Sequence, residues 1–191
     1  MTDYFVDGDE VIDNKLGISD PQKLKVAEQD IVSKKSAIIM SEVSTIFDFE
    51  FLLHIHKILF EDIYNFAGEI RTVDITNPEE HIPFAYAKFI KPEAKRIFHK
   101  LKSKEYLVGL NKGEFVKEVT SLSAELNALH PFRDGNGRII RLFLILLADH
   151  AGYLLDYSQV SAKELIEAYK LAFEGDPKPL LIVYGKATTK T

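Results

Sequence analysis

Cysteine is absent from the 191 residues of the chain. This absence excludes a disulfide scaffold, a cysteine nucleophile and the usual thiolate ligands of structural zinc. Positive charge is in deficit, because 24 Lys and Arg stand against 29 Asp and Glu and give a formal net charge of −5. The balance argues against direct binding to nucleic acid or to an anionic membrane, since both require concentrated basic surface.

Long apolar runs are also missing. The longest, Leu142 to Ala148, is far shorter than the roughly 20 residues that span a bilayer. The first residues show neither the basic nor the apolar segment of a secretion signal. With 46% hydrophobic and 28% charged residues, the composition is that of an ordinary globular protein, and we expect a single cytoplasmic domain.

Apolar spacing predicts a mostly helical chain. Asp20 and Pro21 mark the start of a helix that runs to about Met40. Apolar residues then recur at steps of three and four from Phe49 until Gly68. Further helices are expected at about 91–102, 112–129, 139–148 and 161–173. Residues 139–148 are apolar around nearly the whole circumference, which predicts a buried central helix in an all-α fold.

A short β-hairpin is expected between the second and third helices. Ile70, Val73 and Ile75 have polar neighbours, and the turn-forming residues 77–80 precede Ile82 and Phe84. Proline at position 83 is incompatible with a fully paired central strand, so the hairpin should be an exposed edge that can recruit another chain. We divide the chain into an N-terminal arm (1–20), one domain (21–185) and a disordered tail (186–191).

A polar loop opens the central helix and holds most of the chemically reactive residues. It reads His130-Pro131-Phe132-Arg133-Asp134-Gly135-Asn136-Gly137-Arg138-Ile139-Ile140-Arg141. Its two glycines allow close approach of a ligand to the backbone, and the helix that begins there offers free N–H groups to an anion. Arg138 and Arg141 are three residues apart on one helix face and can add two cationic groups. The loop therefore predicts a phosphate site beside a titratable histidine.

Simpler structural roles exist for single residues of this loop. His130 could satisfy the last carbonyls of the preceding helix, and Asp134 could be the N-cap of the central helix. Phe132 is best interpreted as a core residue that fixes the loop. With a polyphosphate bound, however, Asp134 could hold Mg²⁺, which often takes one or two carboxylates together with phosphate oxygens. His56, on the second helix, is interpreted as a core-edge or surface histidine.

The twelve residues resemble the signature of the Fic (Fic/Doc, or Fido) family, His-x-Phe-x-[Asp/Glu]-Gly-Asn-Gly-Arg-x-x-Arg, at every defining position. Residues 54–72 are similar to the family's helix that leads into its flap, and residues 11–18 and 161–180 are also similar to family segments. The resemblance implies the Fic fold, a helical bundle around a buried central helix with a short β-hairpin flap.

The resemblance also implies an activity, the transfer of AMP from ATP to a Ser, Thr or Tyr hydroxyl of a target protein. His130 would be the general base, and a near-neutral pKa would suit it to that role. Asp134 would hold Mg²⁺ against the phosphates. The phosphates themselves would be bound by Gly135, Asn136 (backbone and side chain), Gly137, Arg138 and Arg141. Among these, Arg141 would reach the γ-phosphate.

The flap would bind the target by strand addition, with Ile75, Ile82 and Phe84 in contact with it. Residues 78–80 and Pro83 make this flap stiffer and more acidic than common family flaps, so the target is an open question. Stand-alone bacterial members modify type II topoisomerases, which suggests such a target by analogy.

Many family members carry an inhibitory helix, [Ser/Thr]-x-x-x-Glu-[Gly/Asn], whose glutamate pairs with the second arginine of the motif. Glu174-Gly175 lacks the Ser or Thr, since Lys170 occupies that position, and Ser121-x-x-x-Glu125 is followed by leucine. We therefore expect a separate antitoxin protein to supply the glutamate, which would make this chain the toxin of a two-component pair.

Two other functions are consistent with the motif. A Fic enzyme could transfer UMP or phosphocholine, or remove AMP, although the Gly-Asn-Gly loop favours ATP over the phosphocholine branch. Alternatively, the domain could be a non-catalytic nucleotide-binding module. The intact His130 argues against the module, because an anion site has no need of a base.

Overall fold

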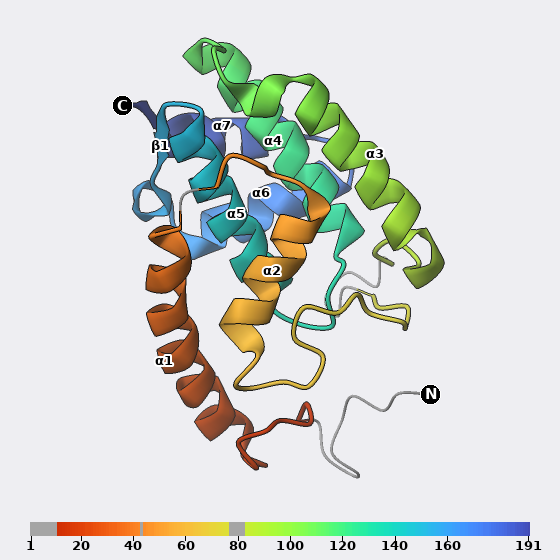
Figure 1. The fold of residues 1–191 in the computed structure, drawn as a ribbon. Coiled ribbons are helices and arrows are strands. Elements are labelled where there is room, and N and C mark those ends of the chain that lie inside the picture. The colour runs from red at the N-terminus through yellow and green to blue at the C-terminus, as the bar shows by residue number, and fades with distance from the viewer. Residues whose placement is uncertain (1–10, 43, 77–82) are drawn as a thin grey trace.

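The computed structural model describes residues 11–42, 44–76 and 83–191, and α-helices dominate these ranges (Figure 1). The helices are α1 (Pro21–Met40), α2 (Phe49–Phe60), α3 (Ile90–Ser103), α4 (Lys112–Leu129), α5 (Asn136–His150), α6 (Ala162–Phe173) and α7 (Lys178–Ala187). Strands β1 (Tyr153–Leu155) and β2 (Thr188–Lys190) form a small antiparallel sheet. The predicted all-α architecture with a buried central helix is confirmed.

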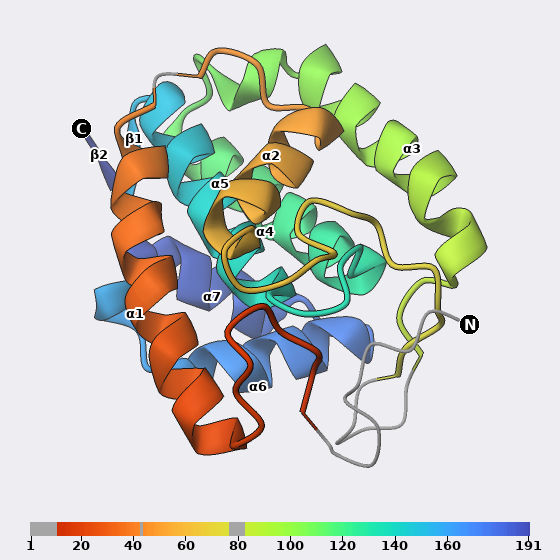
Figure 2. The ribbon, with the colours of Figure 1, turned by 60° about the horizontal axis from the view of Figure 1, so that its bottom comes forward.

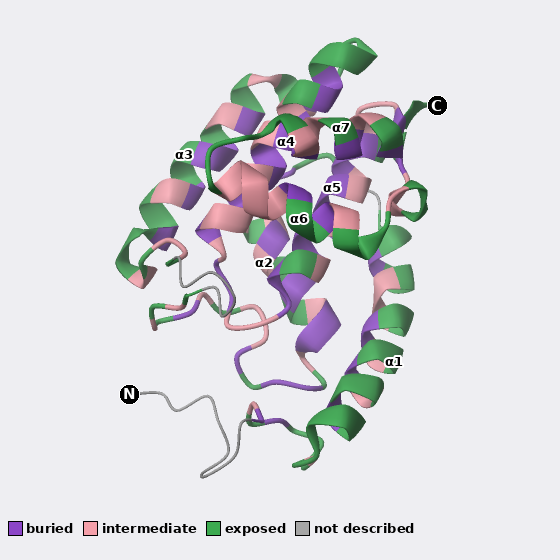
Figure 3. Cartoon of the chain, turned by 180° about the vertical axis from the view of Figure 1, so that it is seen from behind, coloured by how far each residue is buried: buried purple, intermediate pink, exposed green. Residues whose placement is uncertain are grey.

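Helix α5 is the centre of the bundle. It contacts α2, α4 and β1, while α1 and α3 lie on opposite sides of the molecule (Figures 1 and 2). Ile139, Phe143 and Leu147 on α5 have no exposed surface, as expected for a helix with apolar residues on all sides. The outer surfaces of α1 and α3 are largely exposed (Figure 3). The loop at the start of α5 is therefore joined directly to the buried central helix.

Local sequence explains most helix starts. The side chain of Asp20 accepts hydrogen bonds from the backbone of Gln22 and Lys23 at the start of α1. Asn111 and Glu114 form a reciprocal capping box at the start of α4, and both helices have the predicted bounds. The predicted extension of α2 to Gly68 is wrong, because the helix ends at Phe60 and residues 61–67 form turns.

The expected hairpin is present in the described residues as a single antiparallel bridge between Thr76 and Pro83. Beside it, the Phe84 N–H donates to the carbonyl of Ile75 at 3.2 Å. Residues 77–82, and with them Ile82, lie outside the described residues. The arms of the flap thus meet at its base, where they leave the bundle and return to it.

The N-terminal arm lies against the domain in its described part, whereas the C-terminal end differs from the expectation. The arm is described from residue 11 onward, and there the Lys15 N–H donates to the Ile63 carbonyl at 2.8 Å. The expected disordered tail is wrong, because Lys186 and Ala187 end α7 and residues 188–190 form β2. The Thr188 hydroxyl donates to the Tyr184 carbonyl at 2.7 Å, and so short a strand gives no readable alternation in the sequence. Among the described helices, none has the length and apolar composition required to cross a membrane.

Candidate active site

The loop residue Gly135 is the N-cap of α5 and has a left-handed backbone with φ 78°. A Cβ at this position would lie 2.6 Å from two ring atoms of Phe60, so both the conformation and the space require glycine. No side chain of the described residues caps the helix, which makes the interpretation of Asp134 as its N-cap wrong. The positive end of a buried helix therefore has no side-chain acceptor among the described residues, as an anion site requires.

Asn136 closes the loop on itself. Its Oδ1 accepts from the Phe132 N–H at 2.9 Å, and its Nδ2 donates to the Phe132 carbonyl at 2.8 Å. The residue is 3% exposed. Both polar atoms of the amide therefore hold the loop together, and the expectation that the side chain also contacts the phosphates stays a prediction. Its backbone, at the first turn of α5, remains a candidate donor.

A buried histidine on α2, His56, packs against the loop. Phe132 is 1% exposed, the burial that the sequence predicted, and its ring stacks on that of His56 with centroids 3.9 Å apart. His56 Nδ1 accepts from the Gly68 N–H at 2.8 Å, so Nε2 carries the proton that faces the Asp134 carbonyl at 3.3 Å. Burial lowers the pKa of His56 to about 4 and keeps it neutral. The sequence interpretation placed His56 at the core edge or the surface, whereas the residue has no exposed surface and packs against the motif.

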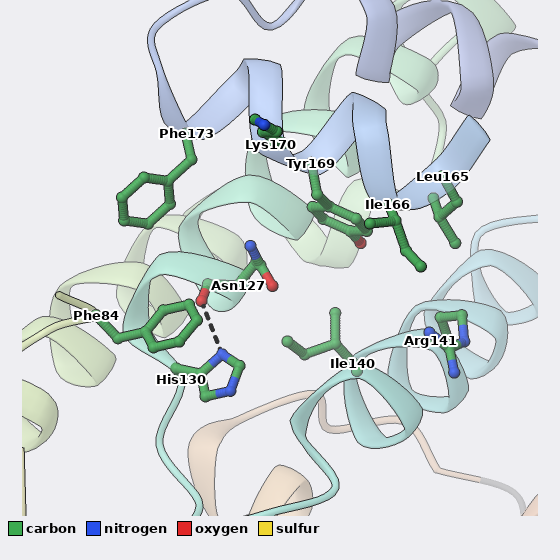
Figure 4. Close-up of a pocket in the computed structure, with 11 residues that line it drawn as sticks. Phe84, Asn127, His130, Ile140, Arg141, Leu165, Ile166, Tyr169, Lys170 and Phe173 are labelled. Carbon is green, nitrogen blue, oxygen red and sulfur yellow. Dashed lines mark hydrogen bonds between the residues drawn. The ribbon is translucent and has the colours of Figure 1, made fainter. Parts of the chain in front are cut away.

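His130 follows the last residue of α4 in a left-handed conformation, φ 45° and ψ 61°. Such backbone is costly for a residue with a side chain and persists where surrounding contacts enforce it. Its Nδ1 donates to the Asn127 carbonyl at 3.2 Å, drawn as the dashed line in Figure 4. Nε2 is therefore the atom that carries the lone pair and can accept a proton.

The pKa of His130 is lowered to about 4, chiefly by burial and further by the positive charge of Arg71. The expected near-neutral pKa is therefore wrong. Phe84 from the flap causes part of this burial, because its ring stacks on the imidazole with centroids 3.7 Å apart and an interplanar angle of 16°. The histidine is consequently present as the neutral base at physiological pH.

Arg71 joins the flap to the motif, and sequence reasoning did not identify it. Its Nε donates to the His130 carbonyl at 2.7 Å, its Nη1 to the Val73 carbonyl at 2.7 Å and its Nη2 to the Ala85 carbonyl. In addition, its backbone N–H donates to the Pro131 carbonyl at 2.9 Å. Arg71 is 2% exposed. The sequence does not reveal this burial, because a single arginine among alternating polar and apolar residues looks like any surface arginine.

The two motif arginines point to different surroundings. Arg138 pairs with Glu28 of α1 and, at 3.1 Å, with Asp134, and its guanidinium lies 4.8 Å from the centroid of the Phe60 ring. Arg141 instead lines a pocket and forms no ion pair with any described residue. The expectation that both arginines face the same anion thus agrees with the observed position of Arg141 better than with that of Arg138.

The pocket has a volume of about 250 Å³ and lies between the motif and α6 (Figure 4). His130, Gly137, Ile140 and Arg141 line one side of it, and the residues on α6 are Leu165, Ile166, Tyr169, Lys170 and Phe173. Phe84 and Asn127 complete the lining. A base, a helix N-terminus, a cation and an apolar wall therefore share one cavity.

Asp134 is the residue of the loop suited to a metal. Its side chain is 40% exposed, and a lone carboxylate is typical of Mg²⁺ sites in which phosphate oxygens and water supply the other ligands. Among the described residues, no group of three His, Asp or Glu side chains could hold a metal by itself. The chemistry of this position thus fits Mg²⁺ that arrives with a nucleotide.

Comparison with known proteins gives a consistent result. The model of the Fic/DOC family matches residues 46–148. The chain is 31% identical over 188 residues to the probable protein adenylyltransferase Fic of Escherichia coli (strain K12), covering 98% of this chain and 92% of that protein.

Two solved structures with bound nucleotides have the same fold. The N-terminal Fic domain of a putative cell filamentation protein from Bartonella quintana, with bound ADP, has a TM-score of 0.95 and 27% identity, covering 98% of this chain and 95% of that chain. The BepC protein of Bartonella tribocorum, with bound AMPPNP, has a TM-score of 0.93 and 30% identity, covering 98% and 97%.

Proposed function

The chain belongs to the Fic/DOC family, and we propose that it is a protein adenylyltransferase that moves AMP from ATP to a Ser, Thr or Tyr hydroxyl of a target protein. The observation that carries the proposal is the shared pocket. It contains the neutral base His130, the N-terminus of α5 beside Gly137, and the cation Arg141. An anion site without catalysis would gain nothing from a histidine fixed in one tautomer.

The reaction requires one proton transfer and one displacement at phosphorus. The target hydroxyl oxygen attacks the α-phosphorus of ATP, the bond from that phosphorus to the oxygen bridging to the β-phosphate breaks, and pyrophosphate leaves. The hydroxyl proton passes to Nε2 of His130, whose Nδ1 keeps its bond to Asn127. The remaining catalysis is in-line positioning and stabilisation of charge.

The nucleotide side of the site is assigned to the start of α5. The backbone N–H groups at Gly135, Asn136 and Gly137 would bind phosphate oxygens, with Arg141 at the outer phosphates. Gly137 suits this role, because a Cβ there would lie 3.3 Å from Nη1 of Arg141. Asp134 would hold Mg²⁺, which when bound would neutralise part of the phosphate charge.

The acceptor side is assigned to the flap. Ile75 and Phe84 adjoin the bridge between Thr76 and Pro83, where an added strand of the target could pair with exposed backbone. The stacked ring of Phe84 would then lie between the bound segment and His130 and guide the hydroxyl to the ring edge. A type II topoisomerase is the target that we infer by family analogy.

Regulation would come from a second protein. Arg141 forms no ion pair with any described residue, so a glutamate from an antitoxin could bind it and occupy the place of the γ-phosphate. In the sequence, neither Glu125 nor Glu174 has the inhibitory pattern, and Glu125 is bound by Arg96 and Lys100. This chain would then be the toxin of the pair.

One experiment tests the activity. The pure protein is incubated with cell lysate, Mg²⁺ and, separately, labelled ATP, UTP, GTP or CTP, alongside His130→Ala and the exposed control His99→Ala. We expect label on protein from ATP alone, retained in His99→Ala and abolished in His130→Ala. Label that persists in His130→Ala would refute the base assignment. ATP that binds without any label transfer would favour the nucleotide-binding module.

A further inference from the structure

Glu28 is a buried carboxylate far from the motif in sequence. It lies on α1 and is 8% exposed, in a segment with no sequence feature that suggests chemistry. The Tyr64 hydroxyl donates to its Oε2, and Arg138 pairs with its Oε1. Both carboxylate oxygens therefore have partners, as a buried charge requires.

The pairing makes a chain of three charges that ends at the solvent. Glu28 binds Arg138, and Arg138 binds Asp134 through Nη2 at 3.1 Å. The Glu28 side chain is 11% exposed, whereas that of Asp134 is 40% exposed. Arg138 is thus fixed at its inner end by Glu28 and by the Phe60 ring, and Asp134 at the outer end is the member that can turn to another partner.

Charge balance shows what Glu28 does for Asp134. If Arg138 had Asp134 as its sole partner, the pair would be neutral and a cation would have to displace the guanidinium to reach the carboxylate. With Glu28 present, the guanidinium keeps a carboxylate when Asp134 leaves it, and the three groups together carry one negative charge. A divalent cation is attracted to that excess charge.

From this geometry we propose that Glu28 is a positioning residue that occupies Arg138 and so keeps Asp134 available to a divalent cation bound with a nucleoside triphosphate. The inference rests on the proposed function, since that function brings Mg²⁺ and ATP to Asp134. It also assigns Arg138 to the acidic side of the loop and leaves the pocket to Arg141. Glu28 itself touches neither nucleotide nor metal.

The test measures binding and not turnover. ATP affinity is determined by calorimetry in a His130→Ala background, once with Mg²⁺ and once with EDTA. The readout is the dissociation constant in EDTA divided by the dissociation constant with Mg²⁺. Glu28→Gln should reduce this ratio on the order of tenfold, the effect of one unit charge near a partly solvated divalent ion. Asp30→Asn removes the same charge from an exposed position of α1 and should leave the ratio unchanged.

A second variant separates charge from structural damage. Glu28→Gln with Arg138→Gln again leaves one net negative charge, so the ratio should return close to that of the parent protein. A ratio unaffected by Glu28→Gln would overturn the inference, as would a double variant that stays as low as Glu28→Gln. Because binding is measured, a protein that shows the predicted ratios but labels no target would support this inference and refute the proposed transfer.

Discussion

Arg71→Lys tests whether the flap and the catalytic histidine form one mechanical unit. Three different nitrogens of the guanidinium donate to the carbonyls of His130, Val73 and Ala85, and the single ammonium nitrogen of lysine cannot reach all three carbonyls. Each buried carbonyl left without a donor costs about 1–3 kcal/mol. If lysine satisfies one of the three, two remain, and we expect a loss of about 3 kcal/mol in unfolding free energy.

The same substitution should reduce catalysis more than nucleotide binding. Arg71 holds the carbonyl of His130, whose left-handed backbone needs external support, but it is not among the residues that line the nucleotide pocket. We therefore expect a lower kcat for AMP transfer with little change in KM for ATP. Lysine keeps the positive charge, so the effect isolates geometry from electrostatics.

The assays are urea unfolding and initial rates of labelling with ATP as the varied substrate. Arg96→Lys is the matched control, because Arg96 has a 54% exposed side chain and pairs with Glu93, whose side chain is 46% exposed. Surface pairs of this kind contribute at most about 1 kcal/mol. Arg71→Lys with control-like stability and unchanged kcat would show that the flap is not held through this residue.

Three further outcomes follow from the site. Gly135→Ala should lose about 2–4 kcal/mol of stability in urea unfolding, because its Cβ would lie 2.6 Å from the Phe60 ring at φ 78°; wild-type stability would contradict the backbone assignment. The unfolding free energy should fall as the pH drops from 6.5 toward 4. In that window the unfolded chain protonates His56 and His130 while the folded protein, with both pKa values lowered to about 4, does not. The slope is about 1.4 kcal/mol per pH unit for each proton, and a flat urea midpoint from pH 7 to 5 would refute the burial argument. Phe84→Ala should expose the His130 ring and raise its pKa from about 4 toward 6.5, seen as an upward shift of the acidic limb in the pH profile of kcat/KM; an unmoved limb would mean that Phe84 does not shield the ring.

The helices were largely predictable because their signals are local. The cap at Asp20 and the capping box at Asn111 each act within a few residues, and the bounds of α1 and α4 follow from them. The apolar circumference of α5 likewise predicted its burial. The sequence did not predict α7 or β2, and the end of α2 depends on contacts with a distant segment, such as the bond from Gly68 to His56.

The site was predictable as a set of residue types but not as a network. The sequence places His130, Asp134 and the glycines together in one loop, because all lie within a few residues of each other. It gives no indication of Arg71 or Glu28, which reach the loop from 59 and 110 positions away. Buried polar partners of this kind are chosen by tertiary geometry, and no periodicity records them.

The difference between the two arginines shows how the fold assigns roles that the motif leaves equal. Positions three apart on a helix are rotated by roughly 60° from each other, so their long side chains can separate to different neighbours. Glu28 on α1 lies within reach of Arg138, and the pocket beside α6 lies within reach of Arg141. The chain thus supplies an internal carboxylate to the first arginine and none, among the described residues, to the second. An inhibitory glutamate from a partner would find Arg138 already neutralised, so its effect should depend on Arg141 alone. Arg141→Gln should abolish inhibition by such a partner, whereas Glu28→Gln should leave inhibition intact. Binding of the partner to both variants is the measurement, and a partner that binds Arg141→Gln as tightly as the parent protein would refute the role of Arg141.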